Sequence, residues 1–311
     1  RTGADSPIVD HLVNAARSGK EVTVIIELMA RFDEAANISL ANRLQEAGAH
    51  VVYGLVGYKT HAKMTLIVRR QGRRLKRFVH LGTGNYHAGT AKAYTDYGML
   101  SDDSALGSDV HRLFLQLTGL GKSLNLKKII SAPFTLHSSM VAFIQREAEH
   151  AKAGRKALIR AKMNSLIEPQ IIEELYKASQ AGVKIELIIR GVCGIRPGIK
   201  GVSENIRVRS VMGRFLEHTR VFYFYNDGEE NLYCTSADWM GRNFFKRIES
   251  CFPVEQYALK RRIIKETFTT HLRDNCQSWV LKPNGQYKRL KPSKRAKPRN
   301  AHEILIGMMQ G

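Results

Sequence analysis

The chain has 311 residues, enough for about two domains with a buried core. Hydrophobic residues make up 43% and charged residues 25%, values that exclude a wholly disordered chain. Forty-nine Lys and Arg residues against 28 Asp and Glu give a formal net charge of +21. A surplus of this size points to a polyanionic partner, whether nucleic acid, anionic lipid or a phosphate polymer.

The cysteines and the apolar runs exclude further classes of protein. Four scattered cysteines, with no CxxC pair, argue against a zinc ribbon or a disulfide scaffold and fit a reducing cytoplasm. No apolar run approaches the ~20 residues that span a bilayer. Because Arg1 is not a natural start, we expect the chain to be a fragment.

In chain order, helical and strand-like patterns alternate, which is typical of an α/β protein. The first half predicts helices over 7–16 and 38–47 and strands over 22–28, 49–55, 59–70 and 73–81. The second half predicts helices over 138–153 and 169–181 and a strand over 183–190.

The two halves resemble each other. The segment 182–190 aligns with 19–27, and His218-Thr219-Arg220 follows at a spacing similar to that of His61-Ala62-Lys63. A helix and strand repeat alone is common. A repeat that carries His-x-Lys in one copy and His-x-Arg in the other indicates two related domains facing one site.

The boundary between the copies is predicted within 117–133, which gives domains at 1–125 and 126–283 and a basic C-terminal tail at 284–311. The stretch 282–299 is rich in Lys, Arg and Pro, so we expect it to be extended and mobile. It is read either as a solvated tail or as a polyanion clamp.

The two histidine motifs are the strongest candidates for chemistry. Residues two apart on a strand point the same way, so His61 should lie beside Lys63, and His218 beside Arg220. A neighbouring cation lowers the pKa of a histidine, which keeps its nitrogen nucleophilic near pH 7, while the cation holds phosphoryl oxygens. A lone histidine is more often structural, but the duplication favours function. The side chains expected to point into the core are Ala62, Met64, Leu66 and Val68.

Further candidates follow each motif. The small residues of Gly82-Thr83-Gly84-Asn85 let backbone N–H groups approach an anion, and Asn85 can bind oxygen. The second copy has Thr235 to Asn243 at a comparable spacing. Arg190 ends a repeated strand and Arg31 follows its equivalent, where α/β sheets place ligands, although each could be a plain surface residue. Tyr94 is read either as a base-stacking ring or as core.

Two His-x-Lys-like motifs, each followed by a small-residue turn, resemble the phospholipase D superfamily. That family has an Asp five positions after the Lys, where this chain has Val68 and, in the second copy, Tyr225. Several segments are more similar to type 1 polyphosphate kinases, and the similarity runs from Arg1 to about Pro283. These segments are His61 to Met64, Leu81 to Tyr86, Tyr94 to Asp96, Lys162 to Leu166, Arg190 to Cys193 and Ser236 to Met240.

The resemblance implies an α/β fold of two related phospholipase D-like domains, each a mixed sheet flanked by helices, facing each other across one active site. It implies reversible transfer of the ATP γ-phosphate to inorganic polyphosphate through a phosphohistidine. The roles it implies are His61 as the phosphorylated nucleophile, His218 as a second catalytic histidine that also contacts the nucleotide, Tyr94 and Arg190 on ATP, Lys63, Asn85 and Arg220 on phosphates, and Arg1 and Arg31 at the magnesium–phosphate site.

The resemblance also implies partners. These are Mg²⁺, ATP or ADP, and polyphosphate, and no nucleic acid is expected. The family has an N-terminal domain and a head domain that this chain lacks, and the full-length protein is expected to form homo-oligomers. We expect a cytoplasmic location, with peripheral association at the inner membrane as a further option.

Two other functions remain open from the sequence. A phospholipase D-like phosphodiesterase would use the same two histidines, although the missing acids at Val68 and Tyr225 count against it. A non-catalytic polyanion-binding module would depend on the basic tail instead.

Overall fold

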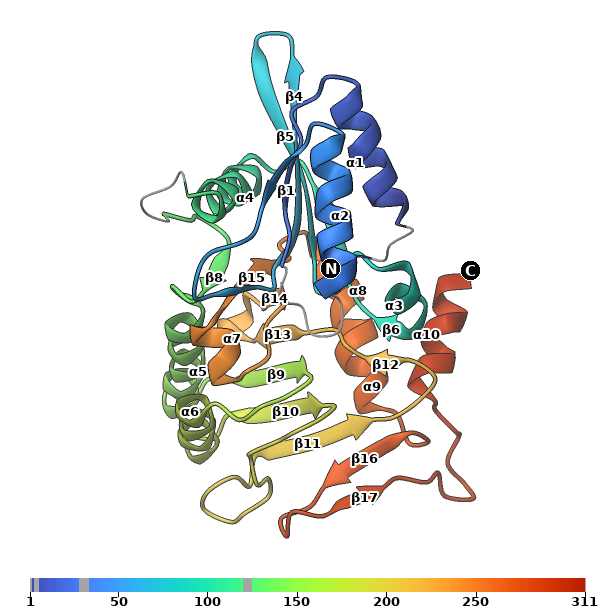
Figure 1. The fold of residues 1–311 in the computed structure, drawn as a ribbon. Helices are drawn as coiled ribbons and strands as arrows, with labels where there is room; N and C mark the ends of the chain where they lie inside the picture. Colours follow the sequence, from blue (N-terminus) through green and yellow to red (C-terminus); the bar gives the residue numbers. More distant parts are fainter. Residues whose placement is uncertain (1, 3–5, 28–33, 120–124, 311) are drawn as a thin grey trace.

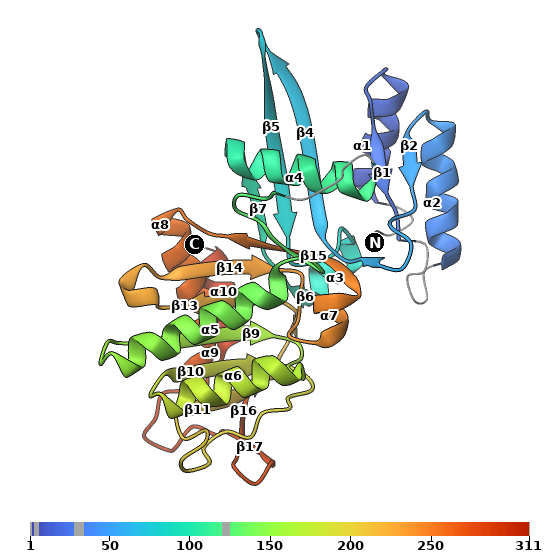
Figure 2. The same ribbon diagram turned by 90° about the vertical axis from the view of Figure 1, so that its left-hand side faces the viewer.

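The computed structural model describes residues 2, 6–27, 34–119 and 125–310 (Figure 1). It is a mixed α/β structure in which a large sheet carries helices on both faces and a narrower part rises from one end (Figures 1 and 2). The predicted fold class, mixed sheets flanked by helices, is confirmed.

The elements of the first half are α1 (Pro7–Arg17), β1 (Thr23–Ile25), α2 (Glu34–Glu46), β2 (His50–Val52), β3 (Lys59–Thr60), β4 (Lys63–Gln71), β5 (Arg74–Gly82), α3 (Ala88–Ala93), β6 (Tyr94–Thr95), β7 (Gly98–Ser101) and α4 (Ser104–Leu117). Strands β1 and β2 pair in parallel, and β4, β5 and β7 form a separate antiparallel sheet. The long β4–β5 hairpin projects from the top of the molecule (Figures 1 and 2).

The elements of the second half are β8 (Ile130–Ala132), α5 (Leu136–Lys152), β9 (Leu158–Met163), α6 (Pro169–Gln180), β10 (Lys184–Ile189), β11 (Ile206–Val211), β12 (Leu216–Glu217), β13 (Val221–Phe224), the short 3₁₀ turn η1 (Asn226–Gly228), β14 (Asn231–Thr235), α7 (Gly241–Phe245), β15 (Arg247–Pro253), α8 (Tyr257–Ile263), the π-helical η2 (Ile264–Thr269), α9 (Thr270–Leu272), β16 (Ser278–Leu281), β17 (Tyr287–Arg289) and α10 (Ala301–Gln310). Their strands form the large sheet in the order β17-β16-β11-β10-β9-β13-β14-β15, with β8 also on β15. Strand β3 of the first half completes this sheet by pairing with β15.

Two hydrophobic cores cover the two faces of the large sheet. Helices α5 and α6 pack on one face, where Met140, Leu175 and Trp239 are fully buried (Figure 2). The other core joins the two halves, because Leu81 of β5 and Leu113 of α4 belong to the same cluster as residues of β13 and β15. This shared core fixes the halves relative to each other.

The predicted strand over 59–70 is in fact two strands, because the backbone breaks at His61 and Ala62. Both of their N–H groups donate to the carbonyl oxygen of Ile248, at 2.9 and 2.8 Å. His61 therefore lies at the end of β3 rather than inside a strand. The prediction that Val68 points into the core is wrong: it lies on the projecting hairpin and is 47% exposed.

The basic C-terminal segment is extended as predicted, but it is held against the domain instead of forming a free tail. Strand β17 pairs with β16, and the Arg299 N–H donates to Asn275 Oδ1 at 2.8 Å. The Ala301 N–H donates to Asp274 Oδ2 at 2.7 Å where α10 begins, and His302 is buried. The first two residues of α10 are therefore buried in the protein, whereas its last turn is exposed.

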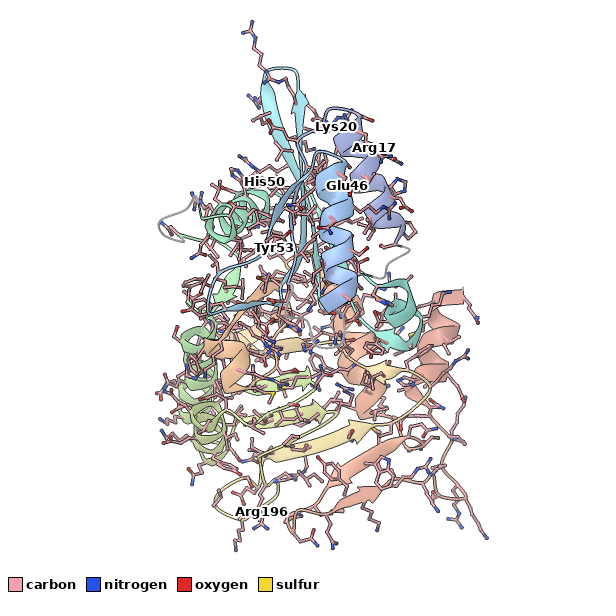
Figure 3. All side chains as sticks on the ribbon, viewed as in Figure 1. Arg17, Lys20, Glu46, His50, Tyr53 and Arg196 are labelled. Carbon is pink, nitrogen blue, oxygen red and sulfur yellow. The ribbon has the colours of Figure 1, made fainter. Side chains whose placement is uncertain are left out.

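The positive charge is spread over distant surfaces. Arg17 and Lys20 lie at the end of α1, whereas Arg196 lies near the opposite end of the molecule (Figure 3). Among the helices of the described ranges, none has the length and apolarity to cross a membrane.

A buried carboxylate ties the first half to the linking segment, which gives a stability prediction. Asp109 of α4 accepts the backbone N–H groups of Lys127, Lys128 and Ile129 at 2.7–3.0 Å. Asp109→Ala leaves these donors without a partner, so we expect it to lower the unfolding free energy by about 3 kcal/mol in urea denaturation. Asp102→Ala, which removes an exposed carboxylate, is the control and should not change the urea midpoint. Equal midpoints for both variants would contradict this role of Asp109.

Candidate active site

Two short parallel strand pairs cross between the halves, and each one sets a histidine opposite a carboxylate. Strand β3 pairs with the start of β15, and β12 pairs with β6. The next residues along the first pair are His61 and Glu249, and those along the second pair are His218 and Asp96. Each histidine therefore receives its carboxylate from the other half of the chain.

Both pairs are hydrogen-bonded through the same ring nitrogen. His61 Nδ1 lies 2.9 Å from Glu249 Oε2, and His218 Nδ1 lies 2.8 Å from Asp96 Oδ1. An ionised carboxylate can only accept, so each Nδ1 carries the proton in the neutral ring. The lone pair of each imidazole is then on Nε2.

The small-residue turns orient the two carboxylates. The Thr83 hydroxyl donates to Asp96 Oδ1 at 2.7 Å, and the Ser236 hydroxyl donates to Glu249 Oε2. A Cβ atom on Gly84 would lie 2.1 Å from Asp96 Oδ2, so this close approach requires glycine. The predicted turn at 82–85 thus lies in direct contact with the carboxylate that holds His218.

The two histidines differ in what surrounds Nε2. His218 Nε2 lies 3.2 Å from Arg220 Nη1, and because a guanidinium only donates, the lone pair of His218 is occupied. His61 Nε2 makes no hydrogen bond with any residue that the structure describes, and its side chain is 27% exposed against 13% for His218. Of the two rings, His61 is the one suited to attack phosphorus.

Cations surround the two rings. Lys63 Nζ is buried and has no hydrogen-bond partner among the described residues. Burial and the nearby Arg220 lower the pKa of Lys63 to about 7, against the opposing charge of Glu249. Arg220 itself is held by both oxygens of Asp238, each at 3.2 Å. Lys63 therefore offers a phosphate oxygen an amine that has no other partner among the described residues, and pairing with that oxygen would favour its charged form.

The pKa of His61 is lowered to about 4, chiefly by burial. Glu249 opposes this by raising the pKa, and Lys63 and Arg220 lower it further. Burial is also the main cause that lowers the pKa of His218. The sequence correctly predicts that the pKa of each histidine is lowered, but burial, not the neighbouring cation, is the main cause.

The structure brings the predicted nucleotide residues close to His218. The Tyr94 ring lies 5.3 Å from the His218 ring, centroid to centroid and tilted by 47°. Arg190 Nε donates to Asn164 Oδ1 at 3.0 Å, and its guanidinium lies close enough to that of Arg220 for their charges to interact. The side chains predicted to contact ATP thus share one site with the second histidine.

Three of the predicted positions lack this support. Asn85 follows the Gly84 turn and is half-buried, but it makes no hydrogen bond with the residues described. Arg1 and Arg31 lie outside the described residues. The phosphate roles of all three stay predictions.

Sequence reasoning did not single out the carboxylates of the site. Asp96 and Asp238 lie inside segments that carried the family resemblance, but neither received a role. Glu249 lies in none of those segments. Glu249 does have a counterpart in the sequence, because it follows the strand residues Arg247-Ile248 just as Asp96 follows Tyr94-Thr95. Only the pairing across the halves makes this correspondence visible.

Comparison with known proteins agrees with this architecture. Residues 1–123 match the family described as polyphosphate kinase C-terminal domain 1, and residues 129–301 match polyphosphate kinase C-terminal domain 2. The chain belongs to the polyphosphate kinase family. The crystal structure of the polyphosphate kinase from Porphyromonas gingivalis matches with a TM-score of 0.91 and 35% identity, over 100% of this chain and 48% of that one.

Curated polyphosphate kinases are more similar in sequence. The protein from Pseudomonas aeruginosa is 58% identical over 306 residues, which is 98% of this chain and 44% of the relative. The protein from Paraburkholderia phytofirmans is 56% identical over 311 residues, which is 99% of this chain and 45% of the relative. The chain therefore spans less than half the length of the polyphosphate kinases it matches.

The charges around His61 predict opposite shifts of its pKa in two variants. Lys63→Met removes a charge that lowers the pKa, so His61 should titrate above about 4. Glu249→Gln removes a charge that raises it, so His61 should titrate lower still. NMR titration of the imidazole signals measures both shifts. Lys76→Met, on the exposed hairpin, is the control and should leave His61 unchanged. Shifts in the same direction, or a His61 pKa near 6.5 in the unaltered protein, would contradict this description of the site.

Proposed function

We propose that this chain carries the phosphotransfer centre of a polyphosphate kinase, which moves the ATP γ-phosphate to inorganic polyphosphate, reversibly, through phosphorylated His61. The observation that supports this most directly is the state of His61. Its Nδ1 is held by Glu249, while neither its Nε2 nor the nearby Lys63 Nζ has a hydrogen-bond partner among the described residues. A nucleophile fixed by a carboxylate next to a site for phosphate oxygens suits covalent phosphoryl transfer.

In the first step, the Nε2 lone pair of His61 attacks the γ-phosphorus. The N–P bond forms as the bond from phosphorus to the bridging oxygen breaks, and ADP leaves with that electron pair. The imidazole becomes positively charged, and the Glu249 carboxylate on Nδ1–H stabilises it. Lys63 and Arg220 offset the negative charge on the transferred phosphoryl oxygens.

In the second step, a terminal phosphate oxygen of polyphosphate attacks the phosphorus of phosphorylated His61. The N–P bond breaks, its electrons return to Nε2, and the polymer is longer by one phosphate. Nδ1 keeps its proton throughout and donates it in a hydrogen bond to Glu249. Neither step therefore needs a proton from water. The two steps are chemically similar, so the same residues serve both directions.

The other site residues are proposed to bind and orient the substrates. Tyr94 offers an aromatic face to the nucleotide base, and Arg190 offers guanidinium N–H groups to its phosphates. His218, held between Asp96 and Arg220, contacts the nucleotide and keeps Arg220 aimed at the transferred group. Asn85 is proposed as a phosphate ligand on the strength of its place after the Gly84 turn.

Magnesium is proposed to arrive with the phosphates rather than to bind protein carboxylates. Asp96, Asp238 and Glu249 are each already bonded to a histidine, an arginine or a hydroxyl. The described residues therefore do not fit a directly coordinated ion, and no step is derived through one. Arg1 and Arg31 remain proposed contacts to phosphates that carry the metal.

The remaining proposals concern organisation and partners. We propose domains at 1–125 and 126–283, with ATP or ADP and polyphosphate as partners and no nucleic acid. The net charge of +21 suits a polymer with about one negative charge per phosphate. Homo-oligomer formation, a cytoplasmic location and peripheral membrane association are proposed from the family resemblance.

Covalent labelling tests the proposed function. After incubation with Mg²⁺ and either ATP or polyphosphate, peptide mapping at alkaline pH should find an acid-labile phosphate on His61. His61→Ala should remove the label entirely, because no imidazole nitrogen remains at this position. His218→Ala should slow labelling without moving it, because the attacking nitrogen is still present. His150→Ala, which removes a buried histidine of α5 outside the site, is the control and should label normally.

Each outcome bears on the proposal. Label that persists in His61→Ala would refute the nucleophile assignment. Hydrolysis of a phosphodiester without nucleotide would favour the phospholipase D-like alternative. Should the chain show no label at all, labelling is repeated with the longer Pseudomonas aeruginosa relative and its matching histidine variant. Label that depends on this histidine there would mean that further parts of the longer protein are needed. No label there would mean that the mechanism is wrong.

A further inference from the structure

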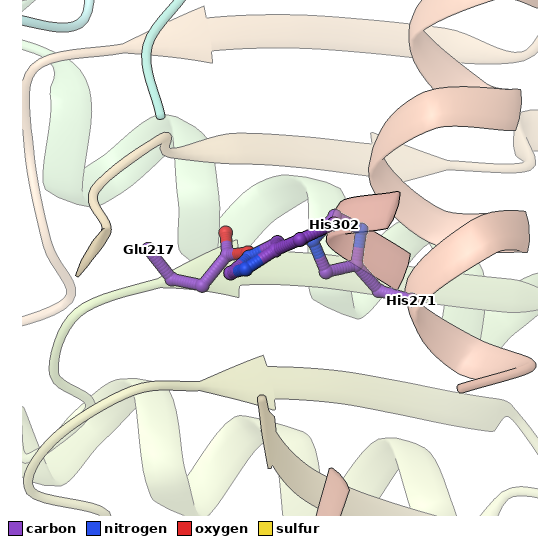
Figure 4. Close-up of side chains that lie close together, drawn as sticks. All are labelled: Glu217, His271 and His302. Atoms are coloured by element: carbon purple, nitrogen blue, oxygen red, sulfur yellow. The ribbon is translucent and has the colours of Figure 1, made fainter. Parts of the chain in front are cut away.

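Polar side chains from four different elements contact a buried carboxylate next to His218. Glu217 Oε1 lies 2.8 Å from His271 Nε2 and accepts from His302 Nε2 at 2.5 Å (Figure 4). Glu217 Oε2 is paired with Lys162 Nζ and accepts from the Thr95 hydroxyl at 3.1 Å. All these residues except Thr95 are less than 5% exposed. Protein groups, rather than water, therefore stabilise the charge on Glu217.

This cluster does not have the geometry of a metal site, although Glu217, His271 and His302 are residue types that bind metals. Donor atoms around Zn²⁺ each lie about 2.0–2.1 Å from the ion, which sets them roughly 3.3 Å apart in a tetrahedron. Here the two nitrogens lie 2.8 and 2.5 Å from the carboxylate oxygen, which are hydrogen-bond distances. The ammonium group of Lys162 on the same carboxylate also opposes a second cation.

The hydrogen bonds of His302 agree with an ionised carboxylate, and both ring nitrogens of His271 face acceptors, Glu217 Oε1 and the Glu266 carbonyl oxygen. Burial favours a raised pKa for Glu217, but Lys162 and His271 and the hydrogen bond from His302 hold it well below the usual range. His302 Nδ1 accepts the Phe215 N–H at 3.3 Å, so its Nε2 carries a proton for Glu217. The carboxylate is thus a fixed acceptor around which its neighbours are arranged.

The hydroxyl of Thr95 links this cluster to the active site. It has one proton, which it donates to Glu217, and it accepts the backbone N–H of His218 at 3.1 Å. The Thr219 hydroxyl donates to the Thr95 carbonyl oxygen or hydroxyl, each at 3.0 Å. Because Thr95 immediately precedes Asp96, the same hydroxyl lies beside both members of the His218–Asp96 pair.

We propose that Glu217 is a positioning residue, which fixes the His218–Asp96 pair through the Thr95 hydroxyl. The cluster also makes the C-terminal helix α10 part of the active-site support, because His302 is its second residue. Glu217 touches no reacting atom. It acts by orienting Thr95, which holds the backbone of His218 and the strand that carries Asp96.

The proposal is tested by the ring titration of His218 in isotope-labelled protein. In the intact protein the pKa of His218 is lowered, with burial as the main cause, Arg220 and Lys63 contributing, and Asp96 opposing. Thr95→Val removes the linking hydroxyl at nearly constant volume. The ring should then loosen toward solvent, and because burial is the main cause of the lowered pKa of His218, that pKa should rise.

Two further comparisons separate positioning from general damage. Thr95→Ser keeps the hydroxyl and should restore the low pKa of His218. His61, whose carboxylate comes from the other strand pair, should titrate as in the unaltered protein in both variants. Glu217→Gln and His302→Ala should raise the His218 pKa in the same direction as Thr95→Val. If Glu217→Gln fails to fold because Lys162 is left unpaired, Thr95→Val and His302→Ala still decide the matter.

The control is His150→Ala, a buried histidine outside the cluster, which should leave His218 unchanged. An unchanged His218 pKa in Thr95→Val and His302→Ala would overturn the proposal, as would equal shifts of His61 and His218. The role of His218 rests on the proposed function. The titration needs no turnover, so failure of the positioning claim is distinguishable from failure of the phosphotransfer claim.

Discussion

The active site depends on two strand pairs that cross between the halves of the chain. Each pair is only two residues long, but its parallel register sets the next residues side by side, His61 with Glu249 and His218 with Asp96. Neither half alone holds both members of the His61–Glu249 pair or of the His218–Asp96 pair. The shared hydrophobic core between β5, α4 and the large sheet is therefore a requirement of the proposed chemistry as well as of stability.

Burial and charge give the two similar pairs different properties. His61 and His218 both lose proton affinity through burial, and both have a carboxylate on Nδ1. The second motif has Arg220 where the first has Lys63. The longer, forked guanidinium reaches the Nε2 atom of its own histidine, whereas the Lys63 ammonium finds no partner in the described structure. One change of residue type thus leaves one imidazole open and the other covered.

Much of this could be predicted from the sequence, because local patterns carry it. Hydrophobic periodicity located α1, α5, α6 and β10 to within a few residues, and the repeated His-x-Lys and His-x-Arg motifs located both rings. Pairings between distant segments left no such pattern. Nothing local to Glu249 or Glu217 distinguishes either from an ordinary strand residue, and the basic composition of 282–299 concealed that His302, just beyond it, is buried in the core. Val68 was misplaced because alternation on a strand predicts burial only where the sheet is covered.

The position of the phosphate on His61 tests the central claim most directly. The pairing of Nδ1–H with Glu249 leaves only Nε2 able to attack, so phosphorylated protein with ¹⁵N-labelled histidine should show coupling of ³¹P to Nε2 of His61. A phosphate on Nδ1 of His61, or one carried by His218, would contradict the account, because each of those nitrogens is already engaged by a carboxylate or by Arg220.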